Sequence, residues 1–163
     1  MLLYRITTEE YAADLSGMGA FLYGGRWNSK GVRLLYTAES SALAMLEALA
    51  HFTMLKQPRS YVKLTIDLSG LIKKWQSTGD AVWYKAVPTA ELGKNWQLNT
   101  QLALTRQVGD SFVKEGSFVA LKVPSALEPD SYNYLLNPGH SLFAAIQVIK
   151  TTPVSFDQRL LNK

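Results

Sequence analysis

The sequence predicts an α+β fold, with a compact mixed or antiparallel β core and flanking helices. Several short segments are rich in β-branched and aromatic residues, two segments have the length and apolar spacing of good helices, and the two kinds do not alternate regularly. A parallel α/β fold would require such alternation. The 163 residues are enough to bury one core, so we expect residues 1–163 to form a single domain.

The N-terminal elements are separated by a glycine-rich segment. Residues 2–7 ("LLYRIT") and 32–37 ("VRLLYT") have the large and β-branched side chains that are typical of strands. Residues 16–31 contain several glycines among polar residues, which predicts a loop between these two strands.

A helix is expected after the second strand. Ser40 or Ser41 can cap it, because a serine hydroxyl accepts a hydrogen bond from an unpaired N–H group of the first turn, and apolar residues continue to about Met54. Residues 61–67 ("YVKLTID") alternate apolar and polar side chains, which indicates a half-buried strand.

The second half of the chain is less regular. Residues 68–96 show no clear period and are expected to be irregular, and a second helix is predicted over about 99–114. A strand over 117–123 should stop at Pro124, which has no N–H to donate. The last strands are expected at 132–136, 145–150 and 153–156.

Composition and charge narrow the classes of function. The chain has no cysteine, which excludes disulfides and thiolate metal sites and fits a reducing cytoplasm. The N-terminus lacks the apolar run of a signal peptide, and the most apolar stretch, 42–50, contains Glu47 and is too short to span a bilayer. The net charge of +4 is scattered along the chain, so we expect a cytoplasmic protein that binds neither membranes nor nucleic acid directly.

Several known motifs are incomplete. "GMGAFL" begins like a dinucleotide-binding fingerprint, but Leu22 stands where the third glycine should be, and no helix is expected to open there. "GGRWNSKG" lacks the Gly-Lys-Ser/Thr order of a P-loop. His51 and His140 are far apart in the sequence and have no flanking carboxylates, so no metal site is predicted. A serine hydrolase is not indicated either, because no G-x-S-x-G motif is present.

Glu47 is the sharpest candidate for a functional residue. Between Glu39 and Lys56 it is the only formally charged residue. Apolar side chains surround it on a helical projection: Leu43, Leu46, Ala50 and Met54 on its own side, and Met45, Leu49 and Phe52 on the other. A helix that is apolar nearly all round is predicted to be buried, and a buried carboxylate needs a cation, a cleft or a ligand. Two interpretations stay open: an ion pair with a core arginine, or a catalytic carboxylate at the edge of a pocket.

Arg26 and Tyr36 are further candidates, each with a structural alternative. The guanidinium of Arg26 is a planar fork suited to phosphates or carboxylates, and the preceding glycines would let backbone approach a ligand. The alternative is a solvated arginine in a surface turn. Tyr36 ends a strand just before the Glu47 helix, where its ring could stack on a ligand or belong to the core.

Polar residues of the C-terminal third have the same two interpretations. Ser125 follows Pro124 at the end of a strand and could cap a turn. Asn133, Asn137 and His140 could orient a ligand or close the Asn-Pro-Gly turn, and turn chemistry is the interpretation we adopt for Asn137. The four tryptophans are expected to anchor the core and loops, because no basic patch accompanies them.

Taken in order, two long segments resemble the RES-domain family. They are "LSGMGAFLYGGRWNSKGVRLLYTAESSALAMLEALAHF" and "LKVPSALEPDSYNYLLNPGHSLF". The family is named for an arginine, a glutamate and a serine, which match Arg26, Glu47 and Ser125 of this sequence. The resemblance covers nearly the whole chain, and one departure is Ser141, where a proline would be expected after the histidine.

This resemblance implies a bacterial toxin of a toxin–antitoxin pair, with a fold similar to that of ADP-ribosyltransferases. It implies that the toxin consumes NAD⁺ by cleaving the nicotinamide–ribose bond, by hydrolysis or phosphorolysis, with no metal and no cofactor beyond NAD⁺ as substrate. It also implies a cognate antitoxin of the DNA-binding Xre type, and it allows a homodimer within the complex. Two alternatives remain open: an ADP-ribosyltransferase that modifies a protein, and a non-catalytic binding module in which Arg26 pairs with Glu47.

The same resemblance assigns roles around the nicotinamide half of NAD⁺. Glu47 is expected to stabilise the positive charge that develops on the ribose, Arg26 to bind the pyrophosphate, and Tyr36 to stack on nicotinamide. Ser125 is expected to donate a hydrogen bond to the ribose or to Glu47. The other expected NAD⁺ contacts are Gly25, which gives access, Trp27 and Asn28, which fix the loop's shape, and Asn133.

Overall fold

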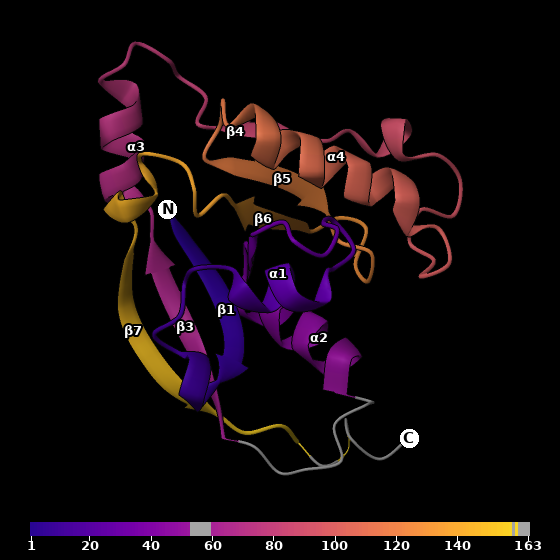
Figure 1. Cartoon of the computed structure of the whole chain (residues 1–163). Helices are drawn as coiled ribbons and strands as arrows, with labels where there is room; N and C mark the ends of the chain where they lie inside the picture. Colours follow the sequence, from indigo (N-terminus) through magenta and orange to yellow (C-terminus); the bar gives the residue numbers. More distant parts are fainter. Residues whose placement is uncertain (53–59, 158, 160–163) are drawn as a thin grey trace.

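The computed structural model describes residues 1–52, 60–157 and 159, the last two residues before the first gap by their backbone only. Its centre is a seven-stranded sheet in the order β4-β5-β6-β2-β1-β3-β7 (Figure 1). The strands are β1 (Leu2–Thr8), β2 (Leu35–Ala38), β3 (Tyr61–Asp67), β4 (Tyr84–Ala86), β5 (Ala120–Pro124), β6 (Tyr132–Leu136) and β7 (Gln147–Val154). The helices are α1 (Met18–Tyr23), α2 (Ser41–Phe52), α3 (Ser69–Gln76) and α4 (Leu102–Glu115), with 3-10 turns η1 (Glu9–Tyr11), η2 (Thr89–Leu92) and η3 (Phe143–Ala145). The β4–β5 pair is parallel and the other pairs are antiparallel, so the α+β fold with a mixed sheet is confirmed.

The sheet consists of two halves that meet at one point. Strand β1 pairs with β3 along its whole length, from Leu2 opposite Asp67 to Thr8 opposite Tyr61. Its pairing with β2, in contrast, is limited to Tyr4 opposite Ala38. The β1-β3-β7 half and the β4-β5-β6-β2 half can therefore diverge beyond this pair, and Figure 1 shows them running in different directions.

Helices cover both faces of the sheet. Successive side chains in a strand point to opposite faces. On β1, Leu3 packs in the core cluster of α3, whereas Tyr4 packs against the apolar side of α2. On β6, Leu136 belongs to the α3 cluster, whereas Leu135 packs with Phe112 of α4. By this alternation α2 and α4 cover the two halves of one face, and α3 lies on the other.

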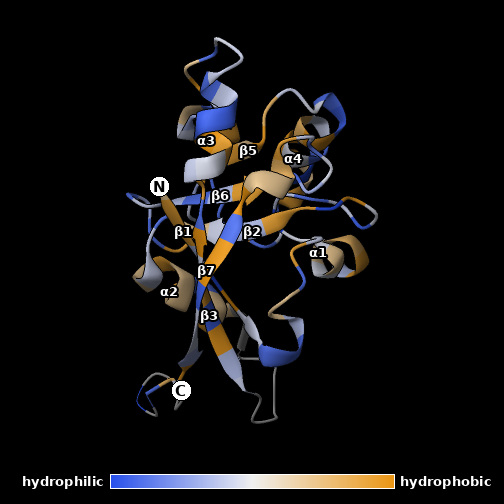
Figure 2. Cartoon of the chain, turned by 90° about the vertical axis from the view of Figure 1, so that its left-hand side faces the viewer, coloured by the Kyte–Doolittle hydropathy of each residue, from blue (hydrophilic) through white to orange (hydrophobic). Residues whose placement is uncertain are grey.

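The distribution of hydropathy agrees with this packing. In Figure 2 much of the orange, hydrophobic colour lies on the strands, while α3 and α4 carry blue segments on their outer sides. All four tryptophans are buried, as expected for core and loop anchors. In the described part of the chain, no helix is long and apolar enough to cross a membrane.

The strongest periodic patterns were predicted correctly. The strands predicted at 2–7, 61–67 and 132–136 correspond to β1, β3 and β6, and the expected second helix corresponds to α4. The helix α2 begins where a serine was expected to cap it: the Ser40 hydroxyl accepts a hydrogen bond from the N–H group of Leu43 at 3.1 Å. The predicted end of this helix at Met54 lies outside the described residues.

The prediction that residues 68–96 are irregular is wrong, because they contain α3 and β4. The helix α3 is short, yet it is amphipathic: Leu71 and Trp75, four residues apart, are buried, and Lys73 and Lys74 are exposed between them. One apolar pair over two turns is a weak periodic signal, which explains why the sequence did not reveal it.

The loop predicted at 16–31 contains α1, so the expectation that no helix opens at "GMGAFL" is also wrong. Gly17 precedes α1 in the left-handed region, with φ 70°, and a Cβ there would lie 2.9 Å from the backbone of Leu34. A glycine is therefore required at this entry point. Leu22 still stands where the dinucleotide fingerprint needs a glycine, so that motif remains incomplete.

Three strand boundaries differ from the predictions. Strand β2 begins at Leu35 and β5 at Ala120, each three residues later than predicted, and the two expected C-terminal strands are one continuous strand, β7. Pro153 does not interrupt β7 because this strand lies at the edge of the sheet, where a missing N–H leaves no neighbouring strand without a partner.

Candidate active site

Glu47 is held by polar side chains from two other elements. Its Oε1 atom accepts a hydrogen bond from the Ser125 hydroxyl at 2.9 Å and from Asn133 Nδ2 at 2.6 Å. Ser125 is fully buried, and its oxygen also accepts the N–H groups of Leu127 at 3.1 Å and Glu128 at 3.2 Å. These two donors direct the single hydroxyl proton of Ser125 toward the carboxylate. The expected contact between Ser125 and Glu47 is confirmed.

The helix that carries Glu47 is less buried than predicted. Leu43 and Ala44 are buried against the sheet, but Leu46 is 40% exposed and Glu47 itself is half-buried. The prediction of an all-round buried helix is wrong because the sheet covers only one side of α2, and apolar residues on the other side remain at the surface. The carboxylate therefore stands at the edge of the core.

Arg26 is fixed by backbone and side-chain acceptors that precede α4. Its Nη1 donates to the carbonyl oxygen of Trp96 at 3.0 Å, and its Nη2 donates to Asn99 Oδ1 at 2.8 Å. Burial lowers the pKa of Arg26, and attraction to the Glu47 carboxylate raises that pKa in part. The two charges thus act on each other through space. Because a guanidinium has five N–H donors, Arg26 keeps donors for an anion in addition to these two bonds.

Tyr36 is built into the loop that carries Arg26. Its hydroxyl donates to Asn28 Oδ1 at 2.7 Å and accepts the N–H group of Trp27 at 3.1 Å. Burial raises the pKa of Tyr36 well above its usual value, so the hydroxyl stays protonated and available for the first of these bonds. A Cβ at Gly25 would collide with this hydroxyl. Gly25 is therefore required by packing inside the protein, and its predicted role in ligand access remains a prediction.

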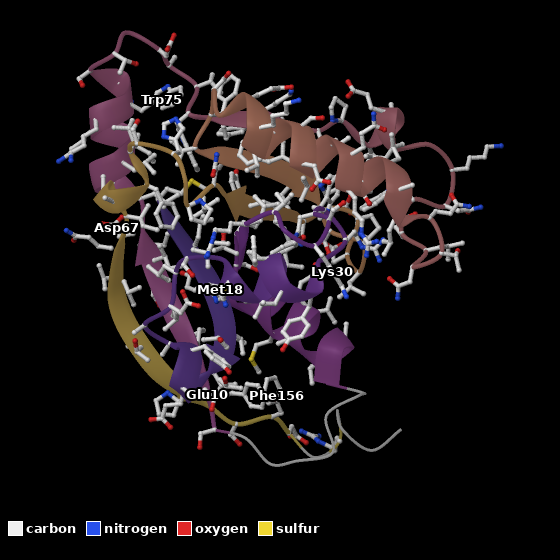
Figure 3. The ribbon with its side chains drawn as sticks, in the orientation of Figure 1. Glu10, Met18, Lys30, Asp67, Trp75 and Phe156 are labelled. Carbon is white, nitrogen blue, oxygen red and sulfur yellow. The ribbon has the colours of Figure 1, made fainter. Side chains whose placement is uncertain are left out.

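Asn28 determines the path of the loop, as expected. It is fully buried, and its Nδ2 donates to the carbonyl oxygens of Ala20 at 2.9 Å, Ser29 at 3.0 Å and Val32 at 3.0 Å. Trp27 is buried beside it, 3% exposed. Figure 3 labels Lys30, near the end of this loop, between α1 and α4.

The register of the sheet brings the loop and the helix to one face. Tyr36 lies opposite Leu135, and Ala38 lies opposite Asn133. Tyr36, which contacts the loop, and Asn133, which contacts Glu47, therefore point to the same side of the sheet. Five of the residues expected from the sequence meet on this side: Arg26, Tyr36, Glu47, Ser125 and Asn133.

Asn137 and His140 serve the turn after β6. Asn137 Oδ1 accepts the N–H group of Gly139 at 2.9 Å, and His140 Nδ1 accepts that of Leu142 at 3.1 Å. The turn interpretation is confirmed for Asn137 and extends to His140. The sequence-based candidates of this region thus divide: Asn133 belongs to the Glu47 site and the other two do not contact it.

Arg5 is a charged residue of β1 that the sequence did not single out, and because Leu3 and Arg5 alternate with Tyr4 along the strand, Arg5 points to the α3 face, away from Glu47. It follows Tyr4, the residue at which β1 meets β2, and its Nε is buried with no hydrogen-bond partner. Burial lowers the pKa of Arg5, which Asp14 raises only in part. A buried N–H group without an acceptor is costly, but Arg5 does not belong to the Glu47 site. The available signal was a single arginine inside a strand of large apolar residues.

Two surface hollows lie away from Glu47. An open groove of about 370 Å³ runs along the outer side of α4, and another of about 320 Å³ is lined by residues near Trp75 and Phe118. Neither hollow is lined by Glu47 or Arg26. Within the described residues, no group of three or more His, Cys, Asp or Glu side chains could hold a metal ion.

Comparisons with known proteins place these features in a family. The family model described as "RES domain" matches residues 2–157. The "Toxin Res" of Yersinia enterocolitica is 35% identical over 162 residues, covering 98% of this chain and 99% of that protein. The "Prs ADP-ribosylating toxin" of a Sphingobium species is 29% identical over 163 residues, covering 98% of this chain and 96% of that protein. A chain in the crystal structure of the M. tuberculosis MbcT–MbcA toxin–antitoxin complex is similar in fold, with a TM-score of 0.73 and 21% identity over 94% of this chain and 84% of that chain.

Proposed function

The chain belongs to the RES-domain family, and we propose that it is the toxin of a toxin–antitoxin pair and consumes NAD⁺ by cleaving the nicotinamide–ribose bond. The observation that carries this proposal is the arrangement around Glu47. A carboxylate is oriented by Ser125 and Asn133 and stands on the same face as a guanidinium that it influences electrostatically. The carboxylate can stabilise a developing positive charge, and the guanidinium can bind a diphosphate.

A single carboxylate is enough for this chemistry. In NAD⁺ the nicotinamide ring is cationic, so it leaves as a neutral molecule and no acid has to protonate it. The ribose carbon becomes positively charged as the bond lengthens, like the oxocarbenium ions of glycoside hydrolysis. A carboxylate held in advance toward that carbon stabilises the transition state without reorganisation. In this proposal Glu47 has that role, and Ser125 and Asn133 are its orienting partners.

The loop side of the site would bind the phosphates. Arg26 retains N–H donors beyond those bound to Trp96 and Asn99, and a guanidinium fork matches phosphate oxygens in pairs. Tyr36 has its hydroxyl engaged with Asn28, so the proposal assigns nicotinamide stacking to its ring. Trp27 and Asn28 support this arrangement because they hold the loop in shape. Gly25, in the same loop, stays a proposed NAD⁺ contact.

The names of related proteins support two parts of the proposal. A relative is named a toxin, and the similar fold comes from a toxin–antitoxin complex, which favours an antitoxin as the partner of this chain. We keep the Xre-type identity of that antitoxin, the cytoplasmic location and the single domain over 1–163 as predictions. Another relative is named an ADP-ribosylating toxin, which favours transfer to a protein as the second candidate function.

The non-catalytic alternative has less support. It requires Arg26 and Glu47 to form a structural pair, whereas Arg26 directs its guanidinium to Trp96 and Asn99. The guanidinium of Arg26 is therefore held by these two hydrogen bonds and not by its attraction to Glu47.

Product analysis separates these functions. Purified protein is incubated with NAD⁺, with and without inorganic phosphate, and nicotinamide and the ADP-ribose product are quantified. We expect nicotinamide release by the wild type: ADP-ribose would indicate hydrolysis, and an ADP-ribose phosphate ester formed only with phosphate would indicate phosphorolysis. Labelled NAD⁺ added with cell extract would mark a protein band only if the chain is a transferase. No nicotinamide under any of these conditions would contradict the proposal.

A further inference from the structure

The helix α4 lies directly against the backbone of the loop that carries Arg26. The buried hydroxyl of Thr105 donates a hydrogen bond to the carbonyl oxygen of Arg26 at 2.6 Å. One turn further along the helix, a Cβ at Gly109 would collide with the carbonyl group of Trp27. The missing side chain of Gly109 thus lets helix backbone and loop backbone touch, and a glycine is required by this close approach.

Two charged residues of α4 bind the loop on either side of this contact. Arg106 Nε donates to the carbonyl oxygen of Gly25 at 2.9 Å. Asp110 Oδ1 accepts the N–H group of Ser29 at 2.9 Å. The cationic Arg106 thus donates to a carbonyl oxygen, and the anionic Asp110 accepts from an N–H group. Hydrogen bonds to charged groups are stronger than those between neutral groups.

These two residues are not part of the core. Arg106 and Asp110 are half-buried and, with Ser29, line the open groove on the outer side of α4. The core contacts of the helix are made by other residues, among them Phe112, which packs against β5 and β6. Removing Arg106 or Asp110 should therefore release the loop while leaving the packing of α4 in place.

We propose that Arg106 and Asp110 are positioning residues, which hold the loop so that Arg26 presents its free N–H donors to the phosphates of NAD⁺. This inference rests on the proposed function for its ligand. The guanidinium of Arg26 is held from the preceding segment by Trp96 and Asn99. Arg106 and Asp110 hold the loop backbone on either side of Arg26. A shift of the loop would therefore move the Cα of Arg26 while Trp96 and Asn99 still hold its guanidinium.

The test compares Asp110→Ala and Arg106→Met with two matched variants. Asp110→Asn keeps an oxygen that can accept the Ser29 N–H but loses the charge, so its changes should be smaller than those of Asp110→Ala. Gln107→Ala changes an exposed neighbour that lines the same groove, and it should have no effect. Each protein is measured for amide hydrogen exchange over residues 24–31, for KM and kcat with NAD⁺, and for Tm.

We expect the loop amides of Asp110→Ala and Arg106→Met to exchange about 10-fold faster, as for loss of one charge-assisted hydrogen bond. KM for NAD⁺ should rise by about the same factor, with a smaller change in kcat. Unchanged exchange in both variants, or faster exchange with unchanged KM, would overturn the inference. If Asp110→Ala does not fold, Arg106→Met provides the same comparison.

The two proposals can fail separately. A wild type that releases no nicotinamide under any condition would remove the proposed function. The exchange measurement would then still decide whether these two residues hold the loop, and wild-type exchange rates in both variants would overturn that part as well.

Discussion

The Arg26 loop and the Glu47 helix bring opposite charges to one face of the sheet by different means. The loop, residues 24–31, is irregular, and it owes its shape to hydrogen bonds and close contacts with Tyr36 and α4. Glu47 stands on a regular helix that packs on the sheet through one side, and only its carboxylate needs orienting partners. The packing of a helix on the sheet already determines where its charged side chain lies. A charged residue on an irregular loop is positioned only when hydrogen bonds and close contacts fix the loop at several points.

This difference separates stability from activity. Changes at the Glu47 carboxylate should alter turnover and leave folding almost untouched, because the helix packs without it. A change at Gly109, beneath the loop, should alter both, because this close backbone contact both places the loop and packs α4 against it. Matched variants of the two regions test this difference.

The largest effect is expected for Glu47→Gln. The amide has the same shape, but it lacks the negative charge that would stabilise the transition state. We expect NAD⁺ turnover to fall by roughly 10²–10³-fold, with Tm close to that of the wild type. Turnover is measured as nicotinamide release and Tm by differential scanning fluorimetry. Glu10→Gln removes one exposed carboxylate from η1 and is the control for net charge. Wild-type turnover in a folded Glu47→Gln protein would exclude the assigned role.

The second prediction concerns the contact beneath the loop, tested with two helix glycines. Alanine normally stabilises a helix relative to glycine by about 0.5–1 kcal/mol. Gly19 is exposed in α1 with open space around it, so Gly19→Ala should stabilise the protein by that amount. At Gly109 the sign should reverse, because the new Cβ meets the Trp27 carbonyl, and overpacking costs about 1–3 kcal/mol.

The free energy of unfolding of both glycine variants can be measured in urea, together with the turnover of NAD⁺. Gly109→Ala should lose stability and activity, whereas Gly19→Ala should keep its activity. If both alanines stabilise the protein equally, the backbone of α4 does not lie against the loop as described.

The sequence predicted the Glu47 side better than the loop side. The position of Ser40 marked the start of α2, and the resemblance to the RES-domain family led to the pair of Ser125 and Glu47, which the structure confirms. The burial of α2 was overestimated because the sequence shows how many sides of the helix are apolar. It does not show how many of those sides other elements of the protein cover. A helix pattern therefore gave the position of the carboxylate and misjudged its exposure.

The support of the loop could not be read from the sequence, because it joins segments about 80 residues apart. Nothing in the local pattern of α4 says which residues its inner side will meet. One signal was present: Gly109 lies in the middle of a helix, where glycine is unfavourable unless something approaches closely. A hydrogen bond such as that of Arg106 to a backbone carbonyl leaves no mark of its own in composition or spacing.

A third prediction compares two asparagines at opposite ends of β6. Asn133 donates to Glu47, whereas Asn137 closes the turn after β6. Asn133→Ala should lower turnover by about 10-fold through loss of a charge-assisted hydrogen bond, with a small change in stability. Asn137→Ala leaves the Gly139 N–H without its acceptor and should cost about 1 kcal/mol of unfolding free energy, with normal turnover per folded molecule. Equal loss of turnover in both variants would show that Asn133 acts on the fold and not on the carboxylate.

The smallest effect is expected outside both regions, at His140. Burial lowers its pKa in the folded state, and its Nδ1 accepts the Leu142 N–H, a bond that requires this nitrogen to be unprotonated. As the pH falls below about 6.5, the ordinary value for histidine, the unfolded chain takes up a proton before the folded protein does. Stability should therefore decrease over this range and level off below the folded pKa.

His140→Asn isolates this contribution, because asparagine places an acceptor oxygen near the position of Nδ1 and does not titrate. Between pH 7.5 and 5.5 the wild type should lose no more than about 3 °C of Tm relative to this variant. Other groups titrate in both proteins and cancel in the difference. A wild type that gains Tm relative to His140→Asn on acidification would mean that the folded state favours the imidazolium. The turn after β6 would then be held by a charge and not by the acceptor nitrogen of His140.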